Sequence, residues 1–193
     1  LKKVRVAAAP KLCEAVNRQM SHLQMGSAQI ELSFEDLPFE QWNKVGSTKI
    51  ELMYKPSAQM TARPLRKIAS GGEVSRVMLA CKVVLGESDV CDTLVFDEVD
   101  AGVGGATAVA LAEVLAQLAK THQVIVVTHL PQVAVMGSRH YVVSKTEEHN
   151  ALPITSLTEV SGVQREEEIA RMLSGSITET SLAHARELLA EVH

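Results

Sequence analysis

The sequence has few aromatic residues, few cysteines and no large excess of one charge. Aromatic side chains make up 3% of its 193 residues, which argues against a single-strand nucleic-acid binder built on stacked aromatic platforms. The formal net charge of -4 excludes a strongly basic protein that coats nucleic acid by charge alone. Hydrophobic residues at 46% and charged residues at 22% indicate a folded globular chain with an aliphatic core.

The cysteines and the apolar runs are equally sparse. Cys13, Cys81 and Cys91 are odd in number and form no CxxC pair, so neither a disulfide framework nor a zinc knuckle is indicated. No run approaches the ~18 apolar residues of a membrane span, and the start has no signal-peptide pattern. We therefore expect a cytoplasmic protein with no membrane partner. The first residue is Leu1 and not Met, which suggests that the sequence begins partway through a longer protein.

A phosphate-binding P-loop is also missing. None of the eleven glycines is followed by lysine, so the motif GxxxxGK[ST] cannot be present. We expect that this chain cannot hold the phosphates of ATP by itself.

The first third of the chain has two hydrophobic patterns. Apolar residues recur every three or four positions from Leu1 to Leu23, which predicts a helix that either kinks or restarts at Pro10. A bundle helix and the tail of a coiled-coil arm both fit this spacing. Alternating residues over 28–35 and 49–54 predict antiparallel strands in a layer separate from any parallel sheet. Residues 55–69 are predicted to be a loop.

The rest of the chain predicts an α/β arrangement. A helix from Val74 to a C-terminal Gly86 precedes a strand at 93–96, a helix at about 106–120 and a strand at 123–128. This β-α-β pattern predicts parallel strands whose carboxyl ends share one edge. Two more strands and two more helices complete the prediction, at about 141–145, 154–160, 165–173 and 181–192.

The sequence Ser70-Gly71-Gly72-Glu73 precedes the predicted Val74 helix. Ser70 and Glu73 fit a capping box, which is a purely structural explanation. The two glycines need another reason, because each costs up to ~1 kcal/mol relative to alanine inside a helix. Their bare N–H groups at the positive end of the helix form an anion site suited to phosphate.

Acidic residues and a histidine follow the two predicted parallel strands. Asp97 and Glu98 end the first strand, where buried carboxylates need a cation or a shell of hydrogen bonds. In nucleotide hydrolases the first acid of such a pair holds Mg²⁺ and the next orients water. His129 ends the second strand. Ordinary polar strand ends remain the alternative for all three residues. The nearby glycines do not form a dinucleotide site, because Thr107 stands where the third glycine of GxGxxG belongs.

These motifs together resemble a known class. Their order, SGGE at 70–73, TLVFDE at 93–98, Asp100 in a tight turn and VTH at 127–129, resembles the C-terminal half of an ATP-binding-cassette (ABC) ATPase head. Segments 67–76, 96–105, 127–133 and 168–175 resemble the RecN family of bacterial DNA repair proteins, which are related to the structural-maintenance-of-chromosomes (SMC) proteins.

The resemblance implies a fold and a division of the chain. The fold is α/β, the C-terminal lobe of a P-loop NTPase of the ABC head type, with a parallel sheet, an added antiparallel β-layer and an N-terminal coiled-coil stub. Residues 1–25 would be the end of a coiled-coil arm, with Pro10 at its joint. Residues 26–193 would be the lobe. The absent P-loop fits, because such proteins carry it in an N-terminal lobe beyond a long coiled coil.

The resemblance also implies roles for individual residues. The signature turn would contact the γ-phosphate of an ATP held by the opposite subunit; it comprises Ser70, Gly71, Gly72 and Glu73. Asp97 would act on Mg²⁺, Glu98 would polarise the attacking water, and His129 would lie near the γ-phosphate. Asp100 would belong to a loop that crosses the dimer interface. That loop departs from many cassettes, because Gly104 replaces an aspartate.

The implied function is that of a DNA repair ATPase. Two heads would sandwich ATP and Mg²⁺ in a homodimer, and the full-length protein would act on DNA double-strand breaks and their ends, at the nucleoid. The fragment alone would be inactive. The short basic clusters, at Lys2-Lys3-Arg5 and at Arg63-Arg66-Lys67, do not by themselves indicate a DNA groove. A transporter's nucleotide-binding subunit and a non-catalytic module that docks its N-terminal lobe are the alternatives.

Overall fold

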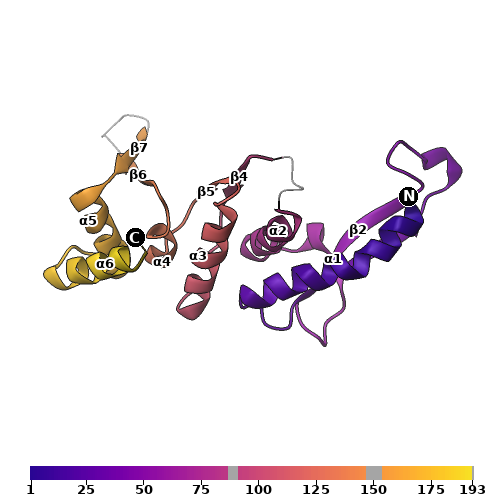
Figure 1. Ribbon diagram of the computed structural model, residues 1–193, viewed down its shortest axis with the longest axis horizontal. Helices are drawn as coiled ribbons and strands as arrows, with labels where there is room; N and C mark the ends of the chain where they lie inside the picture. The colour runs from indigo at the N-terminus through magenta and orange to yellow at the C-terminus, as the bar shows by residue number, and fades with distance from the viewer. Residues whose placement is uncertain (87–90, 147–153, 193) are drawn as a thin grey trace. The chain divides into compact units, whose positions relative to one another are not determined.

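The computed structural model describes residues 1–86, 91–146 and 154–192, which divide into two units (Figure 1). The first unit comprises 1–103 and 117–127, and the second comprises 104–116 and 128–193. Both units mix helices with strands, which confirms the predicted α/β class. Within the described residues, no helix is long and apolar enough to cross a membrane.

The first unit begins with the long helix α1 (Lys2–His22). The helix runs without interruption through Pro10, so the predicted restart at this residue is wrong. Pro10 is exposed, while neighbouring residues on the other face, including Val16 and Met20, are fully buried. Burial of this apolar face stabilises the helix against the cost of an internal proline.

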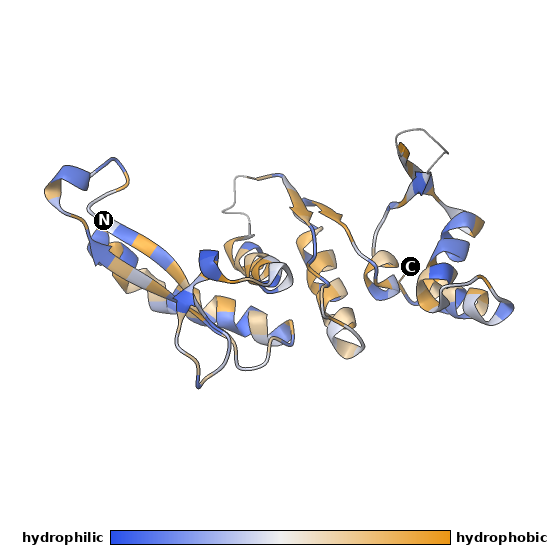
Figure 2. Cartoon of the chain, turned by 180° about the vertical axis from the view of Figure 1, so that it is seen from behind, coloured by the Kyte–Doolittle hydropathy of each residue, from blue (hydrophilic) through white to orange (hydrophobic). Residues whose placement is uncertain are grey.

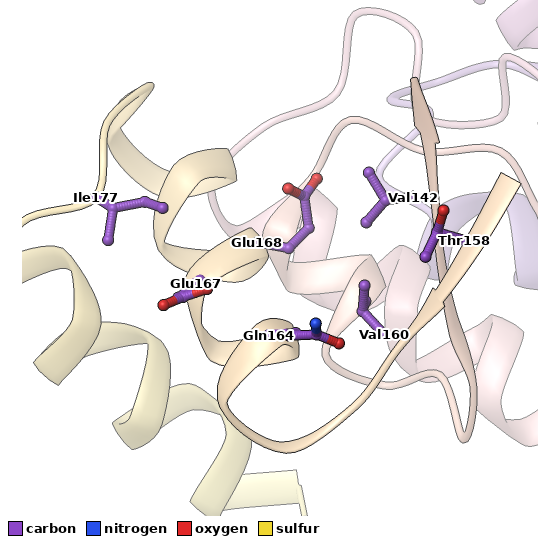
Figure 3. A pocket seen from close by; sticks show the side chains of 7 residues that line it. All are labelled: Val142, Thr158, Val160, Gln164, Glu167, Glu168 and Ile177. Atoms are coloured by element: carbon purple, nitrogen blue, oxygen red, sulfur yellow. The ribbon is translucent and has the colours of Figure 1, made fainter. Parts of the chain in front are cut away.

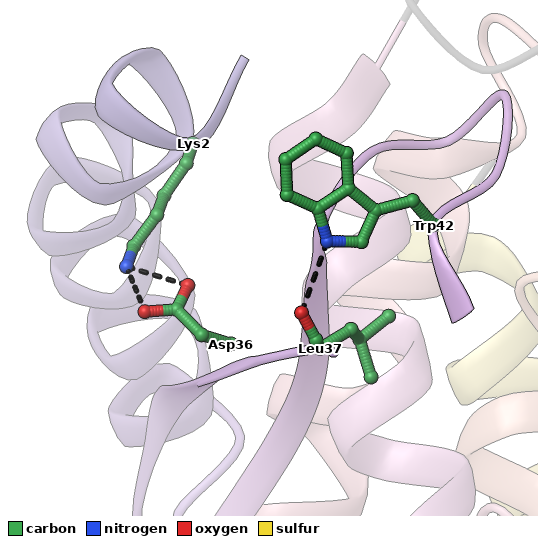
Figure 4. A network of polar contacts seen from close by, with 4 residues as sticks. All are labelled: Lys2, Asp36, Leu37 and Trp42. Carbon is green, nitrogen blue, oxygen red and sulfur yellow. Dashed lines mark hydrogen bonds and ion pairs between the residues drawn. The ribbon is translucent and has the colours of Figure 1, made fainter. Parts of the chain in front are cut away.

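The start of α1 contacts the loop that joins the first two strands. Lys2 Nζ lies 2.6 Å from both carboxylate oxygens of Asp36, and Trp42 Nε1 donates to the Leu37 carbonyl at 3.0 Å (Figure 4). Arg5 Nη1 donates to the Val45 carbonyl at 2.7 Å. The loop is thereby fixed against the first turns of the helix.

An antiparallel sheet packs on α1. Strand β1 (Gln29–Asp36) pairs antiparallel with β2 (Thr48–Lys55), which confirms the two predicted strands; burial alternates along much of β1 but not along β2. The predicted loop at 55–69 is partly wrong, because β3 (Arg63–Pro64) adds a short third strand and a 3₁₀ turn, η2 (Leu65–Lys67), follows it. The sheet is separate from the parallel strands, as expected. Figure 1 shows α1 alongside this layer.

Helix α2 (Gly71–Leu85) packs against α1 and starts one turn before the predicted Val74. Val77, Leu79 and Ala80 on its buried face join Val16 and Met20 of α1 in the core. The helix ends at Gly86, whose φ of +49° fits a glycine. The first residues of α2 therefore belong to a helix that is anchored in the core.

Strands β4 (Thr93–Phe96) and β5 (Gln123–Val126) form the parallel pair, which confirms that prediction. Leu94 and Phe96 are buried, whereas Val95, Ile125 and Val127 are 65%, 47% and 56% exposed. Both strands are coloured largely hydrophobic in Figure 2. Parallel sheets are normally covered on both faces, whereas the described residues of the first unit leave this apolar face open.

The second unit carries most of α3 (Ala106–Leu118), a β-hairpin and a pair of packed helices. Its other elements are α4 (Pro131–Ala134), β6 (His140–Thr146), β7 (Ile154–Val160), α5 (Gly162–Ser174) and α6 (Glu179–Val192). Strands β6 and β7 pair antiparallel. The short α4 was not predicted, because four residues are too few to show a helical period.

The core of the second unit lies where α5 and α6 meet. Val135, Ile169, Ala170 and Ala185 are buried there, and the leucines of α6 pack against them. Arg165 of α5 donates from Nη2 to three carbonyl groups at the end of α4, namely Ala134 at 3.4 Å, Val135 at 3.0 Å and Gly137 at 2.7 Å.

Candidate functional site

The signature turn, residues 70–73, opens helix α2. Ser70 is the N-cap, and its Oγ accepts a hydrogen bond from the Glu73 amide at 3.3 Å, as the sequence predicts. Ser70 and Gly71 are exposed. Gly72 is buried, and the Glu73 amide is taken up by Ser70, so the exposed part of this helix start, where the helix dipole favours an anion, is at Ser70 and Gly71.

The glycines of this turn are explained by the chain segment that approaches them. A Cβ atom on Gly72 would lie 2.9 Å from the Cβ of Ala101 and 3.0 Å from the Glu98 carbonyl oxygen. A Cβ on Gly71 would collide with the Glu98 carboxylate. The sequence indicated that these glycines leave room for an anion such as phosphate, whereas in the structure the group that lies against them is the acidic turn, which we define as residues 97–101.

The acidic turn leaves strand β4 and bends sharply at Glu98. Glu98 has a φ of +56°, a left-handed conformation that is costly for a residue other than glycine. Its amide donates to Asp97 Oδ1 at 2.9 Å, and its carbonyl accepts from the Ala101 amide at 3.0 Å. These bonds close the turn and place the Glu98 side chain over the start of α2.

The burial of the acidic pair differs from expectation. Asp97 and Glu98 are both exposed, so the expectation that these carboxylates are buried, and for that reason need a cation or a shell of hydrogen bonds, is wrong. Water already solvates these carboxylates. The described residues contain no group of three or more His, Cys, Asp or Glu side chains arranged to hold a metal. Binding of Mg²⁺ by Asp97 therefore stays a prediction.

Asp100 and Val99, in contrast, are buried in the acidic turn, at 3% and 0% exposure. Arg76 of α2 donates from Nη1 to the carbonyl groups of Val99 at 3.1 Å and Ala101 at 2.9 Å. Sequence reasoning did not select Arg76. The signal was its position in the second turn of the signature helix, where an arginine on the half-buried face needs acceptors.

His129 belongs to the second unit, three residues beyond β5. Its side chain is exposed, and the Leu130 amide next to it donates to Thr128 Oγ1 at 3.0 Å. Phe96 pairs with Val126, so both parallel strands end at one edge. That His129 acts beside Asp97 and Glu98 stays a prediction.

A separate groove of about 310 Å³ lies in the second unit between β6, β7 and α5 (Figure 3). Apolar side chains and Glu167 and Glu168 line it, and Glu168 is held by Arg171 at 2.6 and 2.8 Å. This bond keeps the pKa of Glu168 below its usual range. The groove contains none of the predicted site residues.

No family model matches the sequence, but curated proteins and solved structures do. The chain is 39% identical to the DNA repair protein RecN of Streptomyces coelicolor over 96% of its own length and 34% of that protein. It is 41% identical to RecN of Mycobacterium leprae over 98% of its length, and 49% identical to RecN of Deinococcus radiodurans over 75%. The chain thus spans about a third of the first two relatives, within their C-terminal part.

The fold is similar to that of SMC heads. A structure from work on ATP-driven dimerization and DNA-stimulated activation of SMC ATPases aligns with a TM-score of 0.54 and 17% identity, over 90% of this chain and 98% of the other. The Smc head with coiled coil and joint from Pyrococcus yayanosii gives 0.56 and 17%, over 97% and 30%. At these identities the likeness concerns the fold alone. In sequence the chain matches the C-terminal part of RecN proteins, and its fold is that of SMC head domains.

Proposed function

We propose that this chain is the C-terminal lobe of the ATPase head of a longer, SMC-like DNA repair protein. Residues 1–25 are the end of a coiled-coil arm, and 26–193 are the lobe. The similarity to the DNA repair protein RecN of Streptomyces coelicolor and of Mycobacterium leprae supports this function. The same similarity sets aside the transporter alternative.

The observation that carries the proposal is the contact between the signature turn and the acidic turn. The start of α2, where Ser70 and Gly71 are exposed, lies directly against Glu98, because Gly71 and Gly72 leave room for it. One surface of the lobe thus carries both the turn assigned to the partner's nucleotide and the acid assigned to its own. In this proposal Ser70, Gly71, Gly72 and Glu73 bind the γ-phosphate of an ATP held by a second copy of the protein. Each lobe thereby closes its partner's site.

The acidic pair would serve the nucleotide held by the same subunit. Asp97 is an exposed carboxylate with one oxygen bonded to the Glu98 amide, and carboxylate oxygen is the protein ligand that Mg²⁺ prefers. The ion would neutralise charge on the phosphates. Glu98 would polarise the attacking water, His129 would contact the γ-phosphate, and Asp100 would orient the loop that crosses to the partner.

The open face of the parallel sheet supports a missing N-terminal lobe. Val95, Ile125 and Val127 expose apolar surface that a parallel sheet normally buries. We propose that a lobe carrying the P-loop covers this face and supplies the floor of the ATP site. The assembled protein then hydrolyses ATP, dimerises through its heads and acts on double-stranded DNA, with breaks as its substrate, at the nucleoid of the cytoplasm.

Reconstitution tests the proposal. ATP hydrolysis is measured for this chain alone, for its N-terminal part alone and for the mixture, with linear or closed circular DNA. We expect turnover from the mixture, none from this chain alone, and a larger stimulation by linear DNA. A mixture that binds but never hydrolyses ATP would support the docking-module alternative.

The Glu98→Gln variant of the full-length protein tests the assigned chemistry. The change keeps the shape and removes the negative charge that orients water, so turnover should fall at least about 100-fold. ATP binding should persist, and the ATP-bound dimer should live longer on size-exclusion chromatography. Turnover equal to that of the wild type would remove Glu98 from this role.

A further inference from the structure

Two neighbouring side chains of α2 hold the acidic turn by its backbone. Ser75 Oγ donates to the Asp97 carbonyl at 2.9 Å, and Arg76 donates to the Val99 carbonyl at 3.1 Å. These carbonyl groups belong to the residues directly before and after Glu98. A second Arg76 bond, to the Ala101 carbonyl at 2.9 Å, fixes the far end of the turn.

We call the bonds from Ser75 and Arg76 to the acidic turn the tether. The tether acts where the backbone is under strain. A residue with a side chain in the left-handed region, such as Glu98 at +56°, keeps that conformation only when its surroundings impose it. Helix α2 is anchored in the core by Val77, Leu79 and Ala80. Bonds from Ser75 and Arg76 therefore transmit the position of a rigid helix to the peptide groups on both sides of Glu98.

The surroundings of Arg76 suit a permanent, charged tether. Burial lowers the pKa of its guanidinium, while the charge of Glu73, the buried Tyr54 phenol and Asp100 act in the opposite direction. Arginine stays protonated in such a setting. Its bonds to the carbonyl groups are thus charge-assisted and stronger than neutral ones.

We propose that Arg76 is a positioning residue, which together with Ser75 holds Glu98 in the conformation that presents its carboxylate to the attacking water. The inference rests on the proposed function and adds a residue to it. Because the same helix begins with the signature turn, Arg76 also links the phosphate-binding end of this lobe to the acid that serves the other nucleotide. Movement of the signature turn would therefore displace Glu98, and movement of Glu98 would displace the signature turn.

Steady-state ATP hydrolysis by full-length variants tests this role. Arg76→Ala should lower kcat at least about tenfold and change KM for ATP less than twofold, because in this proposal Arg76 acts through Glu98 and not on the nucleotide. Arg76→Lys keeps one charged donor and should recover part of the loss. Ser75→Ala should have a smaller effect of the same kind. Arg18→Ala, which removes an exposed arginine paired with Glu14 in the same unit, is the matched control and should behave as wild type.

A double-mutant cycle separates positioning from a merely structural effect. If Arg76 acts through Glu98, Arg76→Ala combined with Glu98→Gln should be no slower in single-turnover hydrolysis than Glu98→Gln alone. If the double variant is slower than Glu98→Gln by the factor that Arg76→Ala causes alone, the proposal is overturned. A wild-type kcat in Arg76→Ala would also overturn it. If Arg76→Ala fails to fold, Arg76→Lys and Ser75→Ala enter the same cycle. Should Glu98→Gln itself keep full turnover, the proposed function fails first, independently of Arg76.

Discussion

Each unit of the molecule uses an arginine to hold the chain that follows a parallel strand, but the two arginines have different surroundings. In the first unit Arg76 bonds two carbonyl groups of the acidic turn after β4. In the second, Arg165 bonds three carbonyl groups at the end of α4, the helix after β5. Both segments adjoin residues that we assign to ATP hydrolysis.

The difference lies in what supports each arginine. The charges of Glu73 and Asp100 counteract the effect of burial on the pKa of Arg76, and Gly72 lets the helix touch the turn directly. Burial alone lowers the pKa of Arg165, and its buried Nε has no hydrogen-bond partner among the described residues. The turn at Glu98 is therefore held by polar contacts from two side chains and by the close approach of Gly72, whereas at the end of α4 Arg165 acts together with the packing of Val135 in the core.

The largest effect expected from this comparison is that of Gly72→Ala. Its methyl group would press on the Ala101 Cβ and on the carbonyl oxygens of Glu98 and Ala101, at 2.9 to 3.1 Å, and backbone atoms cannot easily yield. We expect the acidic turn to lose about 3 kcal/mol of local stability. Hydrogen exchange of the full-length protein should show faster exchange of the Ala101 and Val103 amides, which donate to the Glu98 and Asp100 carbonyl groups of the turn.

Gly71→Ala is the matched control for Gly72→Ala. Its methyl group would meet the Glu98 carboxylate, the movable end of a side chain, so the turn should keep its exchange protection. Turnover should still fall, because the carboxylate is displaced. Equal exchange in both variants would show that close approach at Gly72 does not hold the turn.

The next effect is that of Arg165→Ala on the second unit. Removing a charged donor from three carbonyl groups should cost about 2 kcal/mol. The amides of Met136 and Gly137, which bond within the end of α4, should exchange faster, and Arg165→Lys should restore part of their protection. The first unit should be unaffected. Unchanged exchange at α4 would mean that the core around Ile169, and not Arg165, holds this segment.

Much of this architecture could be predicted, because the helical spacing and the strand alternation of apolar residues are both strong in the sequence. The antiparallel strands β1 and β2, the parallel strands β4 and β5, and the cap at Ser70 all follow from local patterns. The exposure of Asp97 and the bonds of Arg76 do not follow from local patterns. They depend on where a turn of the chain folds back, which spacing along a sequence does not encode. The same holds for Pro10, whose cost inside α1 is offset by tertiary packing of the opposite face.

A smaller effect is expected from Ser70→Ala, which tests the cap of the signature turn. Loss of the bond from the Glu73 amide to Ser70 Oγ should cost about 1 kcal/mol of helix stability. Exchange should increase at the first amides of α2 and leave the acidic turn protected, because Ser75 and Arg76 lie one turn further along the helix. Ser70→Asp retains an N-cap acceptor and should restore protection, while its negative charge should weaken ATP-driven dimerisation. Propagation of the loss to Ala101 would show that cap and tether are one cooperative element.

The smallest expected effect is a pH dependence confined to the second unit. Burial, and next the charge of Arg165, lower the pKa of His140, and Glu168 opposes them. The unfolded chain binds a proton near pH 6.5 that the folded unit resists, so stability should decline as the pH falls from about 7 to about 5. Titration of ¹³C-labelled histidine by NMR should give His140 a pKa below the usual value for histidine, and Arg165→Ala should raise it. Exchange protection near α5 should lose its pH dependence in His140→Gln. A normal pKa for His140 would mean that the end of α4 admits water, and that Arg165 is less buried than the comparison with Arg76 requires.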